Sequence, residues 1–120
     1  MRTMTILIER DSKAALKRAA DGFKRAWKSG RSQGETLSFE SPSALFRVIT
    51  PARWALIERL QALGPTSLRG LARALERDVK SVHRDIAALL AEGLVEKDEN
   101  GKVLVPFARI RAEFDMKAAA

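Results

Sequence analysis

The spacing of apolar residues changes along the chain, and each spacing predicts a different element. Met4–Glu9 is a short apolar and β-branched run, which is typical of a strand. Glu35–Glu40 predicts a second short strand. Between them, apolar residues recur at helical spacing and predict a helix that begins at Asp11 or Ser12 and ends at Gly30. The apolar face of this helix would contain Leu16, Ala19, Ala20, Phe23 and Trp27.

Three further helices are marked by residues that favour helix ends. Thr50-Pro51 predicts the start of a helix that runs to about Leu63, because proline at the first position needs no amide donor. Ser67 and Asp78 are N-cap candidates for two more helices, and Gly93 would end the second of these. The segment SALFRVI before Thr50 predicts a short helix or turn packed by Leu45, Phe46 and Ile49. The residues predicted to be buried are Trp54, Ile57 and Leu60 in the first helix, Leu68, Leu71, Ala72 and Leu75 in the second, and Val79, Val82, Ile86, Leu89 and Leu90 in the third.

The segment LVEKDENGKVLVP predicts a β-hairpin around Asn100-Gly101. A two-residue turn would place its apolar residues on both faces. A three-residue loop, with Gly101 in the left-handed conformation, places Val95, Val103 and Val105 on one face, so we favour that loop. The C-terminal FARIRAEFDM fits a helix or a strand, and the alternation of its apolar residues favours the strand.

Composition limits the fold and the chemistry. With 120 residues and 46% apolar content, the chain is large enough for one packed domain, or one domain with a small appendage. It has no cysteine and one histidine, which excludes disulfides and thiolate or histidine-rich metal sites. No phosphate-binding glycine loop or nucleophile motif is recognisable, so we expect neither an enzyme nor a cofactor. Without a signal peptide or an apolar run of about 20 residues, a soluble, cytoplasmic chain with no membrane partner is expected.

The net charge of +7 favours an anionic partner, which leaves nucleic acid, an anionic membrane surface and an acidic protein open. Residues 1–40 hold nine cationic against five acidic residues, and residues 41–120 hold thirteen against ten. The positive charge is therefore spread over the chain. The basic face of the helix between residues 13 and 28 fits an auxiliary DNA contact, a partner-binding face or a solvated surface, and we favour the last.

The third predicted helix of the C-terminal part carries a polar face opposite its apolar residues. At about 100° per residue, Ser81, Arg84 and Ala88 point outward, with Lys80 and Ala87 beside them. Arginine can bind guanine through two hydrogen bonds, lysine and serine can reach bases or phosphates, and small alanines allow close approach to the major groove. Such a face is also found on ordinary solvated helices. Its place after a capped helix and a short turn, and before a hairpin, favours a recognition helix.

Additional contacts to DNA are predicted on both sides of this helix. Ser67 and Arg69 could bind a phosphate at the start of the preceding helix, although N-capping alone also explains Ser67. Lys97 and Lys102 flank the hairpin loop and could touch the neighbouring DNA backbone or the minor groove. Asp98 and Glu99 lie beside these lysines and argue against a strongly cationic hairpin.

The remaining titratable residues of the third helix have local explanations. His83 lies at the margin of the apolar face, so we favour a half-buried structural role and keep a DNA contact as the alternative. Asp85 and Glu92 are interpreted as surface acids, and Asp85 could orient Arg84 or Arg77.

Three segments resemble small prokaryotic MarR-like winged helix-turn-helix regulators, many of which are antitoxin-like: TPARWALIERL, GPTSLRGLARALERDVKSVHRDIAALLAEGLVE and VPFARIRAEFDM. The likeness covers about Phe39 to Met116, and RDVKSVHRD followed by GLVE is its most specific part. It implies operator DNA binding by a homodimer through the second helix of the motif. The implied contacts are Lys80, Ser81, Arg84 and His83, with a wing from Glu96 to Leu104. Gly70 departs from the capping box that glutamate would complete with Ser67.

We therefore expect an α+β chain with a winged helix-turn-helix over residues 42–120. A strand–helix–strand element over residues 1–41 would pair with the C-terminal strand or mediate dimerisation. The expected function is a sequence-specific, DNA-binding transcriptional regulator, a repressor or autoregulator that reads the major groove with Val79–Glu92.

Two other functions were considered, a protein-interaction module and RNA binding. In the first, the chain is a protein-interaction module, such as the antitoxin of a toxin–antitoxin pair, with residues 1–40 as the arm that binds the toxin. Deletion of residues 1–40 would then abolish partner binding and spare DNA binding. RNA binding is disfavoured, because the chain has no tyrosine and few aromatic residues outside the apolar faces that could stack on bases.

Overall fold

The computed structural model of the chain describes residues 2–10, 20 and 34–118. Apart from Ala20, the helix expected between residues 11 and 30 lies outside these ranges, and so does its basic face. The described residues divide into two compact units. The helical unit contains residues 46–108, and the sheet unit contains the described parts of 2–45 and 109–118.

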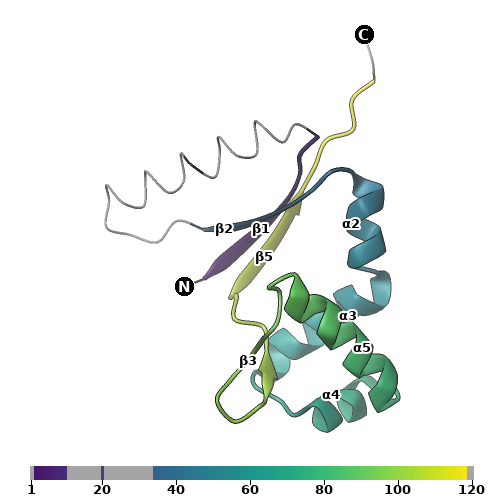
Figure 1. The fold of residues 1–120 in the computed structure, drawn as a ribbon, viewed down its shortest axis with the longest axis vertical. Coiled ribbons are helices and arrows are strands. Elements are labelled where there is room, and N and C mark those ends of the chain that lie inside the picture. Colours follow the sequence, from purple (N-terminus) through teal and green to yellow (C-terminus); the bar gives the residue numbers. More distant parts are fainter. Residues whose placement is uncertain (1, 11–19, 21–33, 119–120) are drawn as a thin grey trace. The chain divides into compact units, whose positions relative to one another are not determined.

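The sheet unit is built on three parallel strands (Figure 1). β1 (Thr3–Ile8) lies in the centre, between β2 (Glu35–Phe39) and β5 (Arg109–Glu113). Both N-terminal strands and the C-terminal strand were predicted, and the pairing of the N-terminal element with the C-terminal strand is confirmed. The expected division at residue 41 placed the C-terminal strand with the helices, whereas β5 joins β1 and β2 instead.

The strand register separates an apolar face from a polar one. Met4 and Ile6 of β1 are buried, and they lie opposite Ile110 and Ala112 of β5. Paired residues of neighbouring strands share a face, so the remaining positions share the other face. That second face contains Thr3, Thr5, Leu7, Thr36, Ser38, Arg109, Arg111 and Glu113.

Helix α2 (Pro42–Val48) follows β2, and the helical alternative for this segment is confirmed. The Ser41 hydroxyl accepts a hydrogen bond from the Ala44 N–H at 3.1 Å, which caps the helix. Leu45 and Ile49 are buried as expected. The expectation for Phe46 is wrong, because its side chain is 48% exposed.

The helical unit contains α3 (Pro51–Leu63), α4 (Leu68–Leu75) and α5 (Val79–Ala91). The expected N-caps of all three are confirmed. The side chains of Thr50, Ser67 and Asp78 each accept a hydrogen bond from the backbone N–H three residues later. These bonds satisfy amides that have no partner within the helix.

The ends of α4 and α5 have the same hydrogen-bond pattern although only one of them uses glycine. Gly93 has a φ of 77°, and the Leu94 N–H donates to the Leu89 carbonyl at 3.0 Å. At the end of α4, Glu76 takes the left-handed conformation with a φ of 54°, and the Arg77 N–H donates to the Ala72 carbonyl. Both ends are Schellman motifs, which stop a helix abruptly and reverse the chain.

The core of the helical unit is formed by residues at helical spacing and by the segment after α5. Leu56 joins the expected Ile57 and Leu60 on the buried face of α3. Four of the expected core side chains, Trp54, Leu68, Leu75 and Leu90, are only half-buried. The fully or nearly fully buried apolar residues of the unit are Ile49, Leu56, Ile57, Leu60, Leu71, Ala72, Val82, Ile86, Leu89, Leu94, Val95, Val103 and Phe107.

The predicted hairpin consists of β3 (Glu96–Lys97) and β4 (Val103–Leu104) in antiparallel register. Asp98 pairs with Lys102, and Gly101 has a φ of 78°, so the three-residue loop Glu99–Gly101 is confirmed. Thr66, between α3 and α4, adds a bridge to Val103 through two backbone hydrogen bonds of 2.9 Å. The hairpin is thereby fixed to the start of α4. The described residues thus form an α+β fold, as expected.

Candidate nucleic-acid interface

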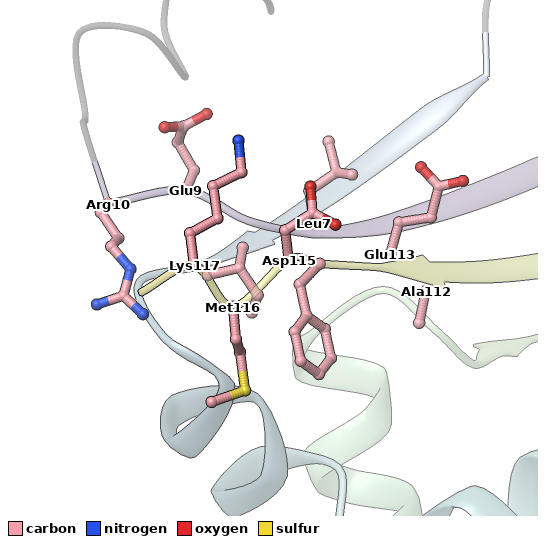
Figure 2. Close-up of a pocket in the computed structure, with 10 residues that line it drawn as sticks. Leu7, Glu9, Arg10, Ala112, Glu113, Asp115, Met116 and Lys117 are labelled. Atoms are coloured by element: carbon pink, nitrogen blue, oxygen red, sulfur yellow. The ribbon is translucent and has the colours of Figure 1, made fainter. Parts of the chain in front are cut away.

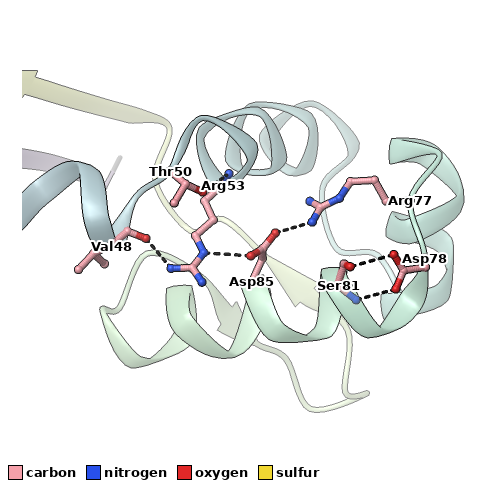
Figure 3. Close-up of polar contacts among 7 residues, drawn as sticks. All are labelled: Val48, Thr50, Arg53, Arg77, Asp78, Ser81 and Asp85. Atoms are coloured by element: carbon pink, nitrogen blue, oxygen red, sulfur yellow. Dashed lines mark hydrogen bonds and ion pairs between the residues drawn. The ribbon is translucent and has the colours of Figure 1, made fainter.

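Helix α5 begins at a hydrogen-bonded Asp78–Ser81 pair (Figure 3). The Ser81 N–H donates to Asp78 Oδ2 at 3.0 Å, and the Ser81 hydroxyl donates to Oδ1 at 2.8 Å. These hydrogen bonds lower the pKa of the Asp78 carboxyl. Ser81 is half-buried, and its hydroxyl is engaged by the cap. It was predicted as an outward-facing contact, but it lies at the side of the helix.

Asp85 in the middle of α5 is buried and holds two arginines from other parts of the helical unit (Figure 3). Arg53 of α3 donates from Nε to Asp85 Oδ1 at 3.0 Å, and Arg77 donates from Nη2 to Oδ2 at 2.7 Å. Arg53 also donates from Nη1 to the Val48 carbonyl at 2.6 Å. Asp85 therefore connects α5 to α3, to the end of α2 and to the turn before α5.

The interpretation of Asp85 as a surface acid is wrong, although its pairing with Arg77 was one of two expected roles. Burial by itself raises the pKa of the Asp85 carboxyl, but the hydrogen bonds and charges of Arg77 and Arg53 outweigh burial and lower it. Asp85 is thus ionised at neutral pH. A signal for this position was present in the sequence, since Val82, Asp85, Ile86 and Leu89 follow one helical face.

The exposed face of α5 is cationic and carries no carboxylate. Lys80, His83, Arg84 and Ala87 are exposed, and Asp85, the one acid within the helix, is directed inward. Lys80 and Arg84 lie one turn apart. Neither takes part in an ion pair among the described residues.

Asp85 lies on the buried side of α5, which was not expected. At 100° per residue, the exposed face of the helix therefore points about 30° away from the expected direction. Ala88 is consequently half-buried, whereas His83 is exposed and not half-buried as we had favoured. Val79, predicted to point inward, is 42% exposed. The predicted contacts at Lys80 and Arg84 keep their outward orientation.

Helix α4 presents two exposed arginines, Arg69 and Arg73, of which only Arg69 was predicted. Arg73 lies one turn after Arg69, and this i, i+4 spacing was the available signal. Ser67 is exposed, and its hydroxyl accepts from the Gly70 N–H at 3.0 Å. A Cβ on Gly70 would lie 3.0 Å from that hydroxyl, so glycine fits this cap without a clash.

The hairpin separates its two lysines. Lys97 lies opposite Val103, and Lys102 lies opposite Asp98, so their side chains leave opposite faces of the hairpin. Both are exposed. Asp98 Oδ1 accepts hydrogen bonds from the Asn100 and Lys102 N–H groups at 2.9 Å, so this carboxylate shapes the loop. The structure does not bring the two lysines together as one contact.

The sheet unit has a hollow at the ends of β1 and β5 (Figure 2). Its lining mixes acids and bases, including Glu9, Arg10, Glu113 and Asp115. This mixture shows no preference for one ligand charge. Among the residues that the structure describes, no cluster of histidine or acidic side chains could hold a metal ion. None of the described helices has the length and hydropathy of a membrane-spanning segment.

The comparisons with known proteins concern the part of the chain that contains these helices. A family model described as HVO_A0114 matches residues 48–112, slightly more than half of the chain. The match begins at the end of α2 and extends into β5, so it includes α3, α4, α5 and the hairpin. No curated protein and no solved structure matches the chain.

Proposed function

The chain belongs to the HVO_A0114 family, and from the geometry of its helical unit we propose that it is a sequence-specific DNA-binding regulator of transcription. In this proposal α5 enters the major groove as the recognition helix. The hairpin β3–β4 acts as a wing beside it. Occupation of the operator by the protein would then repress transcription, including that of its own gene.

The order of elements in the helical unit supports a winged helix-turn-helix. α4 and α5 are joined by a turn of three residues, Glu76 to Asp78, and α3 packs against α4. The hairpin begins at Glu96, three residues after Gly93, and is anchored by the Thr66–Val103 bridge. Three helices and a hairpin in this order are the parts that a winged helix uses to place its second motif helix in the groove.

The observation that carries the proposal is the cationic face of α5. Because Asp85 is buried between Arg53 and Arg77, no carboxylate within α5 opposes the approach of Lys80 and Arg84 to phosphates and bases. The Arg84 guanidinium can donate two parallel hydrogen bonds to a guanine. Ala87 is small and exposed on the same face, so it allows the helix to lie close to the base edges.

The exposed cations outside α5 suit phosphate contacts. Arg69 and Arg73 extend from α4, whose N-terminus also offers backbone N–H groups to an anion. Lys102 lies on the hairpin face opposite to that of the buried Val103. Contacts of this kind fix the position of a protein on the duplex and do not read sequence.

In the first step of the test, the 120-residue chain selects the duplexes that it binds from a random-sequence pool. The wild-type protein should enrich one sequence. Arg84→Ala should then weaken binding to the selected duplex by about 10–100-fold, with little change for unrelated DNA. Arg59→Ala removes an equal charge from the exposed side of α3, and we expect it to weaken both duplexes by the same small factor.

Salt dependence separates phosphate contacts from base contacts. Lys80→Ala should weaken selected and unrelated DNA alike and reduce the slope of log K against log salt concentration by about one. If the pool yields no enriched sequence, or if Arg84→Ala retains full discrimination, the proposal fails.

The competing antitoxin interpretation needs a different test from the deletion of residues 1–40. That deletion removes β1 and β2, and β1 is the strand with which β5 pairs. Loss of partner binding in the deletion variant would therefore reflect loss of the sheet. Partner binding is better tested with point substitutions on the surface of the sheet, because these leave β1 and β2 in place.

A further inference from the structure

The outer edge of β5 has a charge pattern that is complementary to itself. β5 lies at the edge of the described sheet, with β1 on its inner side. An edge strand offers backbone N–H and C=O groups to another strand. Arg109, Arg111 and Glu113 lie on one face of β5, and Asp115 follows two positions after the strand ends. In chain order these residues are two cations followed by two anions.

We propose that two copies of the chain associate through antiparallel pairing of their β5 edges, with a two-fold axis at Ala112. In this register Arg111 lies opposite Glu113 of the second copy, and Arg109 lies opposite Asp115. The two sheets become one sheet of six strands. This inference concerns the sheet unit and does not depend on DNA binding by the helical unit.

The register follows from charge. A two-fold axis at Arg111 or at Glu113 would place two like charges directly opposite each other, which is unfavourable. An axis at Ile110 would oppose Arg109 with Arg111. An axis at Phe114 would oppose Glu113 with Asp115. Of these positions, only Ala112 opposes unlike charges at every charged pair and places a small side chain at the axis.

The apolar side chains agree with the same register. Phe114 is 40% exposed and Met116 is 82% exposed. An axis at Ala112 places Phe114 beside Ile110 of the second copy, on the face that contains Ala112. Figure 2 shows Ala112 and Met116 on one side of the chain and Glu113 and Lys117 on the other. Pairing therefore covers exposed apolar surface and extends the strand from Glu113 to Asp115.

The other edge of the sheet lacks this property. Antiparallel pairing of two β2 strands about Leu37 would oppose Glu35 with Phe39, and no pair of unlike charges would form. An internal ion pair does not distinguish the two edges, because Glu35 is paired with Arg2 and Glu113 is paired with Arg111 within the chain. The second copy is thus expected at β5 and not at β2.

Charge reversal gives the first test. The wild-type chain should have a molar mass about twice 13.3 kDa by light scattering after size-exclusion chromatography. The double substitution Arg109→Glu, Arg111→Glu makes the edge wholly acidic, and Glu113→Arg, Asp115→Arg makes it wholly basic. Each variant alone should dissociate at concentrations about 10–100-fold higher than the wild type. An equimolar mixture of the two should restore the dimer as a heterodimer.

Cysteine substitution gives an independent test, because the chain has no natural cysteine. Directly opposed residues of antiparallel strands have Cα atoms about 4.5–5.5 Å apart, within the range of a disulfide. Ala112→Cys should form a disulfide-linked dimer under mild oxidation. Arg111→Cys should form it at least about tenfold more slowly, since the two positions 111 are not opposed in this register.

A monomeric wild type at all concentrations overturns the proposal. A wild-type dimer that persists in both charge-reversed variants does so as well, and so does faster cross-linking of Arg111→Cys than of Ala112→Cys. Circular dichroism of every variant identifies one that does not fold. If a charge-reversed variant does not fold, the cross-linking rates of Ala112→Cys and Arg111→Cys decide whether the proposal holds.

Discussion

The helical unit and the sheet unit differ in how far apart in sequence their stabilising contacts lie. In the helical unit, each N-cap acts over three residues, and the hairpin pairs residues within one short segment. In the sheet unit, Thr3 pairs with Arg109 near the other end of the chain. The buried apolar residues are also divided unequally between the two units. The described sheet unit contributes Met4, Ile6 and Leu45, and the helical unit contributes all the others. The helical unit is therefore specified by local elements and by contacts within residues 46–108, such as Thr66 with Val103, whereas the sheet unit depends on the pairing of residues 2–45 with residues 109–118.

The largest expected effect tests the core of the helical unit. Leu71→Ala removes a side chain that is 0% exposed and should lower the free energy of unfolding by about 3 kcal/mol. Leu63→Ala is the matched control, because Leu63 is 40% exposed, and its cost should stay below about 1 kcal/mol. Urea unfolding measures both. Equal losses would show that α4 does not pack in the core as described.

The next effect concerns the buried ion pairs. Asp85→Ala leaves Arg53 and Arg77 without their carboxylate and should lower the free energy of unfolding by about 2–3 kcal/mol. The loss is smaller than for a fully buried pair, because the arginine side chains are 17% and 28% exposed. Glu58→Ala removes an exposed carboxylate from α3 and should change stability by less than about 0.5 kcal/mol.

The pH dependence of this difference has a definite sign. The pKa of Asp85 is lowered in the folded chain, so its contribution is complete above the unfolded pKa of about 3.9 and is lost as pH falls through the folded value. The gap in stability between the wild type and Asp85→Ala should thus narrow below about pH 3.9. A gap that stays constant from pH 7 to pH 3 would contradict the ion pairs.

The features that could be predicted from the sequence are those that depend on neighbouring residues. The caps at Ser67 and Asp78 and the loop ending at Gly101 were predicted correctly, because each depends on residues within a few positions. The outward direction of Lys80 and Arg84 was predicted for the same reason, since helical periodicity fixes it.

The errors concern contacts between distant segments. Helical periodicity indicated that Asp85 faces inward with Val82 and Ile86, but its partner Arg53 lies 32 residues earlier, and no local pattern links the two. Ser81 is the exception, because its hydroxyl donates to Asp78 only three residues earlier and is used in the helix cap. The pairing of β1 with β5 was foreseen as one alternative, but its parallel register depends on the whole chain path between them.

A smaller effect tests local capping in the helical unit. Ser67→Ala removes the acceptor of the Gly70 N–H and should lower the free energy of unfolding by about 1 kcal/mol. Ser43→Ala, at an exposed position inside α2, should have an effect below about 0.5 kcal/mol. Thermal unfolding of the two variants gives the comparison. If Ser67→Ala were as stable as Ser43→Ala, the cap would contribute nothing to α4.

The smallest effect is expected in the sheet unit, at the ion pair between Arg2 and Glu35. Arg2 donates from Nε and Nη2 to the two oxygens of Glu35 at 3.0 and 2.9 Å, and this hydrogen bonding lowers the pKa of Glu35. Both side chains are nearly half exposed, at 44% and 45%, so water and salt screen the pair. A double-mutant cycle with Arg2→Ala and Glu35→Ala should give a coupling below about 0.5 kcal/mol at pH 7, and less as pH falls through the lowered pKa. The same cycle with Asp85→Ala and Arg77→Ala should give a coupling several times larger. Equal couplings would remove the contrast between the two units, because burial would then have no influence on the strength of an ion pair in this chain.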